Sequence, residues 1–254
     1  MLGLETLARD GAIVERRAVD PNFLSTLCRL QTAAVALLNE ALAGGDNPAS
    51  RCLVERHTLT HDDADNILGE AGAFYALADA IARPLLSRLG LGSATRSQNG
   101  GVFIADAHLP NASFHWHMDG HWDGLDELGV SFWIPLRDCG ADAPGIAFAR
   151  VDETRRDEVL RCLPQSANPL PADHTPVFWP TVTDEHVGRF GPIEAPTFAV
   201  GDVLIFTNGT LHRTHVGPAM RARRCAMIAR YAMRGATRVR HIMSGSAVKA
   251  STAA

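Results

Sequence analysis

The chain has 254 residues, of which 46% are hydrophobic and 20% charged, and its formal net charge is −4. This composition is typical of a globular domain with a sizeable core and excludes disordered and fibrous classes. The acidic balance argues against a basic nucleic-acid binder, so we expect no nucleic-acid partner.

The sequence shows no membrane span and no export signal. No apolar run approaches the roughly 18 residues that span a bilayer, and the first residues lack the basic and apolar stretches of a signal peptide. The five cysteines are scattered, and no pair has CxxC spacing. A disulfide framework and a structural zinc site are therefore disfavoured, and we expect a cytoplasmic protein without a membrane partner.

The first third of the chain has helical periodicity. An Asp20-Pro21 step is typical of a helix start, and periodic apolar positions follow it as far as a Gly-Gly pair. A second apolar stripe covers residues 62–89, where Pro84 is expected to kink or split the helix. Residues 1–95 are therefore expected to form a mainly helical support.

Beyond this region the sequence becomes rich in short strands. Runs of Val, Ile, Phe and Trp alternate with Gly, Pro, Asn and Asp clusters, which is typical of a β-sandwich or barrel. We expect one domain over 1–254, with the barrel in 96–240, a lid loop in the proline-rich 151–195 and a frayed tail in 245–254. The predicted strands are Gly101–Ala107, Gly129–Leu136, Gly145–Ala149, Thr197–Val200, Val203–Thr207 and Arg224–Met233.

Two short segments carry the candidate metal ligands. The first contains His115, His117 and Asp119, and in an extended chain positions two apart project from the same face. The second is an apolar run that leads into His212 and His215. Two histidines and one carboxylate form the facial ligand set of non-haem Fe(II) oxygenases, which leaves coordination positions open. The pattern alone leaves His212 and His215 as alternative distal ligands.

The spacing of these residues resembles the phytanoyl-CoA dioxygenase-like group of Fe(II)/2-oxoglutarate-dependent oxygenases. That group has a His-x-Asp motif, a distal histidine about a hundred residues later, and an arginine eleven residues after it. The matching residues here are His117, Asp119, His212 and Arg223. Residues 201–231 are similar to the group's distal stretch throughout.

The resemblance covers most of the chain, from about residue 7 to 234. It includes the run Val130–Leu136 after the His-x-Asp motif and the run Asp10–Val14 near the start. One motif of the group is missing. Where the group has Pro-Gly-Ser-His, this chain reads Arg-Val-Asp-Glu over 150–153, so this region supports no inference about the substrate.

The resemblance implies a double-stranded β-helix, a jelly-roll or cupin-like barrel that is mainly β with flanking helices. It implies Fe(II) bound by His117, Asp119 and His212, 2-oxoglutarate as cosubstrate, and ascorbate as a further candidate cofactor. It also implies the reaction. Dioxygen and 2-oxoglutarate give succinate and CO2 while a small-molecule substrate is oxidised, by default hydroxylated, with desaturation and ring closure left open.

A dicarboxylate cosubstrate needs a cation for its far end, and a planar guanidinium pairs with a carboxylate through two hydrogen bonds. Arg223 is the expected partner, with the Thr214 hydroxyl as a second donor. Because neighbouring strand residues face opposite ways, only one of Arg223 and Arg224 can point into the barrel.

Two alternative interpretations remain. One is a cupin-type metalloenzyme without 2-oxoglutarate, and the other is a non-catalytic barrel that only binds a metal or ligand. The cupin-type ligands would be His115, His117, His121 and His212. In the dioxygenase interpretation, the residues expected near the substrate are His115, His121, Trp122, Trp133 and Trp179.

Overall fold

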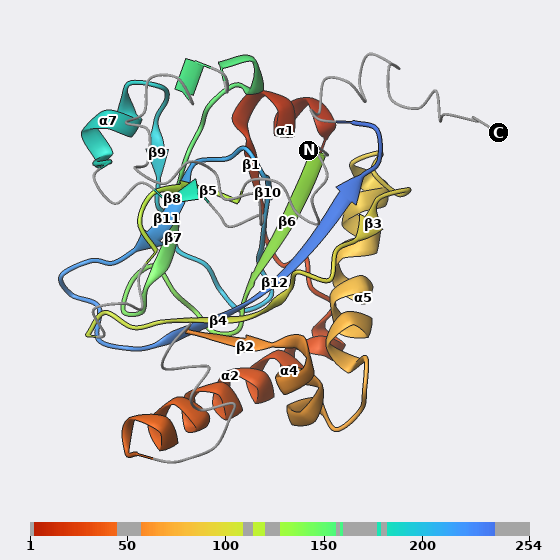
Figure 1. Cartoon of the computed structure of the whole chain (residues 1–254), viewed down its shortest axis with the longest axis vertical. Coiled ribbons are helices and arrows are strands. Elements are labelled where there is room, and N and C mark those ends of the chain that lie inside the picture. Colours follow the sequence, from red (N-terminus) through yellow and green to blue (C-terminus); the bar gives the residue numbers. More distant parts are fainter. Residues whose placement is uncertain are drawn as a thin grey trace.

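The structure, a computed structural model, describes residues 3–44, 57–108, 114–119, 128–155, 158–159, 177–178 and 182–236. Two antiparallel β-sheets pack face to face, and helices cover the outer side of the larger sheet (Figure 1). The expected fold class, a jelly-roll barrel that is mainly β with flanking helices, is confirmed.

The strands divide between the two sheets as a jelly roll requires. The larger sheet has the order β1 (Ala12–Glu15), β10 (Val203–Thr207), β6 (Leu128–Pro135), β12 (Arg224–Met233), β4 (Gly101–Ala105) and β2 (Thr58–Thr60), and β3 (Thr95–Arg96) also pairs with β12. The smaller sheet has the order β8 (Val177–Phe178), β5 (His117–Met118), β11 (His212–His215), β7 (Gly145–Ala149) and β9 (Ile193–Glu194).

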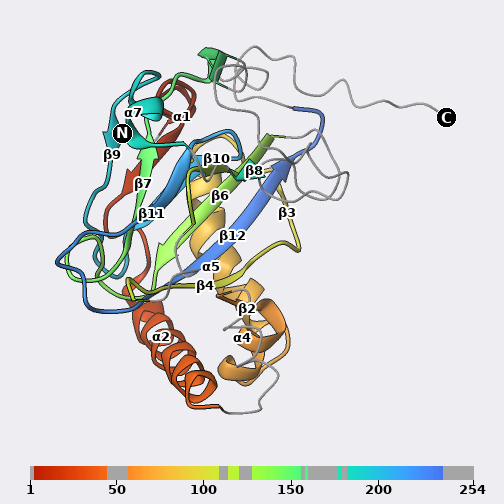
Figure 2. The same ribbon diagram turned by 60° about the vertical axis from the view of Figure 1, so that its left-hand side comes forward.

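Three helices cover the larger sheet, as Figures 1 and 2 show from two directions. The first, α2 (Pro21–Leu42), begins as predicted, and the Asp20 carboxylate accepts a hydrogen bond from the Asn22 amide at 2.9 Å. The others are α4 (His61–Leu68) and α5 (Ala73–Arg88). The shorter helices are α1 (Leu4–Asp10), the 3-10 helix η1 (Glu153–Arg155) and α7 (Asp184–Gly188).

The second predicted helix divides at Gly69–Gly72 and not at Pro84, which lies inside α5. Gly69 and Gly72 have φ values of +89° and +80°, which residues with a Cβ rarely adopt. The Asp65 carboxylate accepts hydrogen bonds from the Gly72 and Phe74 amides at 2.6 and 2.7 Å. The glycines and this carboxylate therefore end α4 and begin α5.

The alternation of β12 decides which of its side chains can reach the barrel interior. Cys225, Met227 and Ala229 belong to the core between the larger sheet and the helices. The alternate residues, Arg224 and Ile228 among them, line a pocket between the two sheets. Period-two alternation therefore assigns even-numbered positions of β12 to the barrel interior.

The strand prediction differs from the structure in one wrong strand and in several missed short strands, which are β1, β2, β3, β5, β8, β9 and β11. Thr197–Val200 does not form a regular strand, since Phe198 makes only an isolated bridge with Cys139. The strand β11 (His212–His215) was not predicted, because its polar side chains hide the strand pattern.

The predicted loop 151–195 contains regular structure in its described parts, which include η1, β8, α7 and β9. Its role as a lid remains a prediction. Among the described residues, the structure has no helix with the length and hydropathy required to cross a membrane.

Candidate metal centre

Three candidate ligands from two neighbouring strands meet in the structure. His117 on β5 lies directly opposite His212 on β11, and Asp119 follows β5. Their donor atoms lie within 4.8 Å of one another, and all three residues are buried. The Asp119 Oδ1 atom is 4.0 Å from the Nε2 atom of His117 and 3.7 Å from that of His212. These distances leave a position that a metal ion can share.

The two imidazole rings are oriented by backbone carbonyls. His117 Nδ1 lies 2.8 Å from the His115 carbonyl oxygen, and His212 Nδ1 lies 2.9 Å from the Thr210 carbonyl oxygen. A carbonyl only accepts, so each Nδ1 carries the hydrogen and each Nε2 presents its lone pair. The tautomers therefore fit metal binding through Nε2.

The protonation states also suit a metal ion. Burial lowers the pKa of His117 to about 3 and lowers the pKa of His212 as well, so both rings are neutral near pH 7. Burial alone would favour the protonated acid form of Asp119. The positive charge of Arg230, aided by a hydrogen bond from the Ser131 hydroxyl at 2.8 Å, nevertheless keeps its pKa below the usual value. The site therefore offers two neutral nitrogens and one carboxylate.

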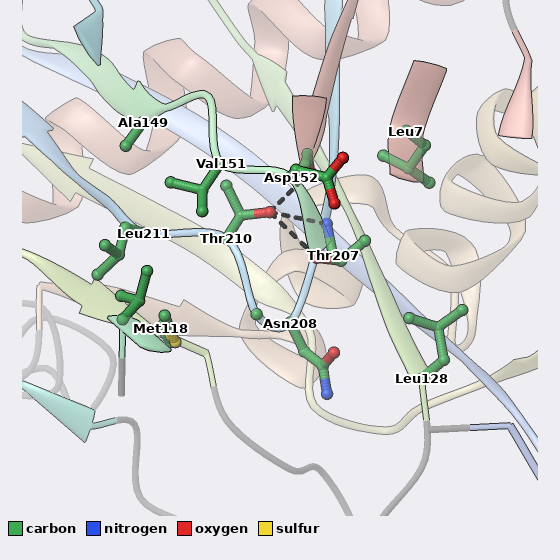
Figure 3. A pocket seen from close by; sticks show the side chains of 13 residues that line it. Leu7, Met118, Leu128, Ala149, Val151, Asp152, Thr207, Asn208, Thr210 and Leu211 are labelled. Atoms are coloured by element: carbon green, nitrogen blue, oxygen red, sulfur yellow. Dashed lines mark hydrogen bonds between the residues drawn. The ribbon is translucent and has the colours of Figure 1, made fainter. Parts of the chain in front are cut away.

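The turn before His212 borders a second pocket, shown in Figure 3, whose lining includes Gly11, Thr207 and Thr210. Hydrogen bonds between these residues hold the turn. The Thr210 hydroxyl donates to the Gly11 carbonyl at 2.7 Å and accepts from the Thr207 amide at 3.2 Å. Gly11 has a φ of +70° at the junction of α1 and β1. Because Thr210 also orients the His212 ring, this junction fixes the distal ligand.

The three candidate ligands open into a pocket between the two sheets. Its wall is mainly apolar, and it also contains three arginines. The apolar residues include Phe103, Ile104, Phe114, Trp133, Ile146, Phe206 and Ile228, and the arginines are Arg213, Arg224 and Arg230.

Arg224 is a buried cation in this pocket. Its Nε and Nη2 atoms donate to the carbonyl oxygens of Pro144 and Gly145 at 3.1 and 3.3 Å, and its guanidinium lies 5.1 Å from the Trp133 ring centroid. Within the described part of the chain, no carboxylate forms an ion pair with it. Burial lowers its pKa because the charge is poorly solvated. A buried, unpaired guanidinium favours an anionic ligand.

The structure corrects the facing assigned to Arg223. Its guanidinium contacts the carboxylate of Asp106 and the side-chain oxygen of Asn39 in α2. These contacts lie on the helix side of β12, and Arg223 does not line the pocket. The alternation of β12 brings Arg224 into the barrel instead.

Thr214 reaches the pocket as expected. It is buried, and its hydroxyl oxygen accepts a hydrogen bond from the Phe114 amide at 3.0 Å. An accepting hydroxyl still has its own hydrogen to donate. Thr214 and the candidate metal ligand His212 share one face of β11, two positions apart.

The residues expected near the substrate have different outcomes. Trp133 is buried and lines the pocket, with its ring edge-on to Phe198 at a centroid distance of 5.0 Å. His115 is exposed and lines a separate surface depression together with Asp184. Three of the expected contacts lie outside the described residues: His121, Trp122 and Trp179.

Neither alternative histidine joins the ligand cluster. In the described part of the chain, the group that can hold a metal consists of His117, Asp119 and His212, without His115 or His215. His215 lies three positions after His212 in β11, so the side chains of the two histidines project from opposite faces of the strand. Sequence reasoning did not identify Ser131 or Arg230, whose only signal was their position on inward faces of β6 and β12.

Neither a family model nor a curated protein matches this chain. Solved structures do match it over most of its length. One is AviO1 from Streptomyces viridochromogenes Tue57, with 13% identity, 92% of this chain and 94% of that chain covered, and a TM-score of 0.52. Another is EvdO2 from Micromonospora carbonacea var. aurantiaca complexed with 2-oxoglutarate, with 12% identity, coverages of 90% and 89%, and a TM-score of 0.50. A third is the apo non-heme monooxygenase ThoJ, with 15% identity, coverages of 92% and 79%, and a TM-score of 0.50. These matches show a shared fold.

Proposed function

We propose that this chain is an Fe(II)/2-oxoglutarate-dependent dioxygenase that oxidises a small molecule and releases succinate and CO2. One observation carries the proposal. The triad of His117, Asp119 and His212 opens into the same pocket as Arg224, a buried cation without a described carboxylate partner. Metal ligands and an anion-binding group in one pocket are what a chelating dicarboxylate needs.

The donor set supports Fe(II) in particular. Two Nε2 atoms and one carboxylate oxygen are the facial set of non-haem Fe(II) oxygenases. When bound, the iron would supply the redox chemistry that couples oxidation of 2-oxoglutarate to oxidation of the substrate. A structural zinc site, by contrast, is normally closed by four protein ligands, and the described residues offer three here.

Arg224 and Thr214 would hold the far carboxylate of 2-oxoglutarate. Both line the pocket, and Thr214 pairs in register with Ile146, next to the Gly145 carbonyl that Arg224 contacts. Arg213 also lines the pocket, but it is paired with Asp184. The two buried arginines, Arg224 and Arg230, outnumber the single carboxylate of Asp119, so these described residues favour an anion in the pocket even before a metal binds.

The remaining wall indicates the character of the substrate. Phe103, Ile104 and Phe114 form an apolar surface beside the metal ligands. Such a wall suits a small molecule with an apolar carbon framework, and hydroxylation is the expected outcome. Membership of the phytanoyl-CoA dioxygenase-like subgroup is part of this proposal and is supported by the His-x-Asp and distal-histidine spacing. The structures of EvdO2, which binds 2-oxoglutarate, and of the monooxygenase ThoJ agree with this class.

Anaerobic titration tests the proposal. Addition of Fe(II) and then 2-oxoglutarate to the metal-free protein should produce a visible charge-transfer band that needs both components and saturates at one cosubstrate per chain. A protein that binds Fe(II) and gives no band with 2-oxoglutarate would refute the proposal and favour the cupin-type alternative.

A further inference from the structure

We infer that Arg230 and Ser131 are positioning residues that hold Asp119 so that only its Oδ1 atom faces the metal. The inference rests on the proposed metal site and extends it to residues behind the ligands. Both side chains are buried, and they come from the adjacent strands β12 and β6, where Arg230 and Ser131 are direct register partners.

Arg230 lies alongside the Asp119 carboxylate as a fork. Its Nε is 3.4 Å from Oδ2, and its Nη2 is 3.4 Å from Oδ1. Its Nη1 donates to the backbone carbonyl of Asn99 at 3.0 Å and lies 3.3 Å from the side-chain oxygen of the same residue. Asn99 therefore fixes the orientation of the Arg230 guanidinium. The fixed guanidinium in turn limits rotation of the Asp119 carboxylate.

The two oxygens of Asp119 have different surroundings. Oδ1 faces the Nε2 atoms of His117 and His212, at 4.0 and 3.7 Å. Oδ2 accepts the Ser131 hydroxyl at 2.8 Å, a normal length for an O–H···O hydrogen bond. For Oδ2 to bind a metal as well, the carboxylate would have to turn and lose this hydrogen bond. The contacts therefore favour a ligand that uses one oxygen and leaves positions for the cosubstrate.

The arrangement also explains why Arg230 is present at all. A buried carboxylate without a cation or hydrogen bonds is strongly disfavoured. Arg230 compensates the charge of Asp119 through contacts at the long end of the hydrogen-bond range, which leave Oδ1 able to bind a metal. Groups that orient metal ligands in this way typically change metal affinity by about 10–100-fold when removed.

The test measures metal binding without 2-oxoglutarate. Ser131→Ala removes the hydrogen bond to Oδ2, and Arg230→Lys keeps the positive charge but loses the fork. For each variant, the dissociation constant for Mn(II) is measured by electron paramagnetic resonance of the free ion. The absorption spectrum of the Co(II)-loaded protein gives the geometry of the site. Tyr231→Phe is the matched control, because it removes a buried hydrogen bond from the opposite face of β12, where the Tyr231 hydroxyl donates to Asp79 at 2.6 Å, without touching Asp119.

We expect Mn(II) to bind about tenfold or more weakly to Ser131→Ala and Arg230→Lys, with an altered Co(II) spectrum, and unchanged metal binding in Tyr231→Phe. Ser131→Ala also keeps the test valid if Arg230→Lys fails to fold. Metal affinity within twofold of wild type together with an unchanged Co(II) spectrum in the folded variants would overturn the inference. If the wild-type protein bound no divalent metal, or if His117→Ala left binding intact, the proposed metal site itself would fail instead.

Discussion

Arg213 and Asp184 form a two-point ion pair that connects α7 to β11, the strand that carries the proposed distal metal ligand His212. Arg213 Nε and Nη2 lie 3.1 and 2.8 Å from the two carboxylate oxygens of Asp184. The indole nitrogen of Trp116 donates to the same carboxylate at 2.9 Å. Because Trp116 precedes His117 and Arg213 follows His212, residues adjacent to both of the proposed ligand histidines contact one carboxylate. Asp184 therefore ties the predicted lid segment to the metal centre.

Asp184→Asn should loosen α7 without unfolding the protein. The ion pair is partly exposed, so we expect global stability to fall by no more than about 1 kcal/mol. The effect should be local, seen as faster amide hydrogen exchange in peptides that cover 182–195. Glu185→Gln is the control, since it removes an exposed ion pair between Glu185 of the same helix and Arg189, the residue directly after it. Equal exchange in the two variants would show that Asp184 does not tether the segment.

Arg224, and not Arg223, should determine the affinity for 2-oxoglutarate. Loss of a desolvated charge pair costs about 2–5 kcal/mol, so Arg224→Met should weaken binding by about 30-fold or more. Arg224→Lys should restore it only in part, because an ammonium cannot form the two-point contact. Isothermal titration calorimetry with 2-oxoglutarate, carried out on the Mn(II)-loaded wild-type protein and on both variants, measures these affinities.

Arg223→Gln is the comparison for that prediction. It leaves the buried Asp106 carboxylate without its cation, so it should lower stability while keeping cosubstrate affinity within twofold of wild type. A large loss of affinity in Arg223→Gln, with none in Arg224→Met, would show that the facing of β12 is reversed.

Fold class, the start of α2 and the five strands β4, β6, β7, β10 and β12 follow from local rules that act within one segment. The Asp20 cap and the alternating apolar runs are of this kind. The candidate ligands His117, Asp119 and His212 were predicted from the His-x-Asp motif and from the family resemblance, and the structure pairs β5 with β11 so that His117 lies opposite His212. The sequence alone left the register of that pairing undetermined.

The facing of β12 could not be predicted in the same way. Both faces of β12 carry apolar residues. The alternation therefore separates the residues into two faces but does not indicate which face points into the barrel. The choice depends on the helices, which cover Cys225, Met227 and Tyr231. Contacts between segments distant in the chain, such as Ser131 with Asp119, have no local sequence signal for the same reason.

Asp202 should make stability depend on pH. It is buried and accepts hydrogen bonds from the Arg17 and Ala199 amides, both at 2.9 Å, and from Arg16 Nη1 at 2.7 Å. Burial opposes its ionisation, but these hydrogen bonds lower its pKa overall. A lowered folded-state pKa contributes stability above the unfolded pKa of about 3.9, and this contribution is lost as the pH falls through the folded-state pKa.

Asp202→Asn should therefore lower the free energy of unfolding at pH 7 by about 1–3 kcal/mol. The difference from wild type should shrink as the pH is lowered through the folded-state pKa. Urea denaturation of the wild-type protein and of Asp202→Asn, at pH 7 and near pH 3, measures this difference in the free energy of unfolding. A destabilisation of the same size at both pH values would mean that the charge of Asp202 contributes nothing.

Metal content should separate the ligands from the neighbouring histidine. His117→Ala and His212→Ala each remove one of three donors, so the purified proteins should retain little Fe(II) after anaerobic loading and desalting. His115→Ala should retain wild-type content, because its side chain is exposed and lies outside the ligand cluster. If the iron content falls in His115→Ala and persists in His212→Ala, the ligand set has been assigned incorrectly.

The most direct test of the central claim is release of succinate from 2-oxoglutarate in air. Enzymes of the proposed class turn over the cosubstrate slowly even without their substrate, so the identity of the substrate is not needed. The wild-type protein with Fe(II) should form succinate in a reaction that requires dioxygen, and His212→Ala should form none. Absence of succinate with the iron-loaded wild-type protein, or equal release from His212→Ala, would contradict the assignment.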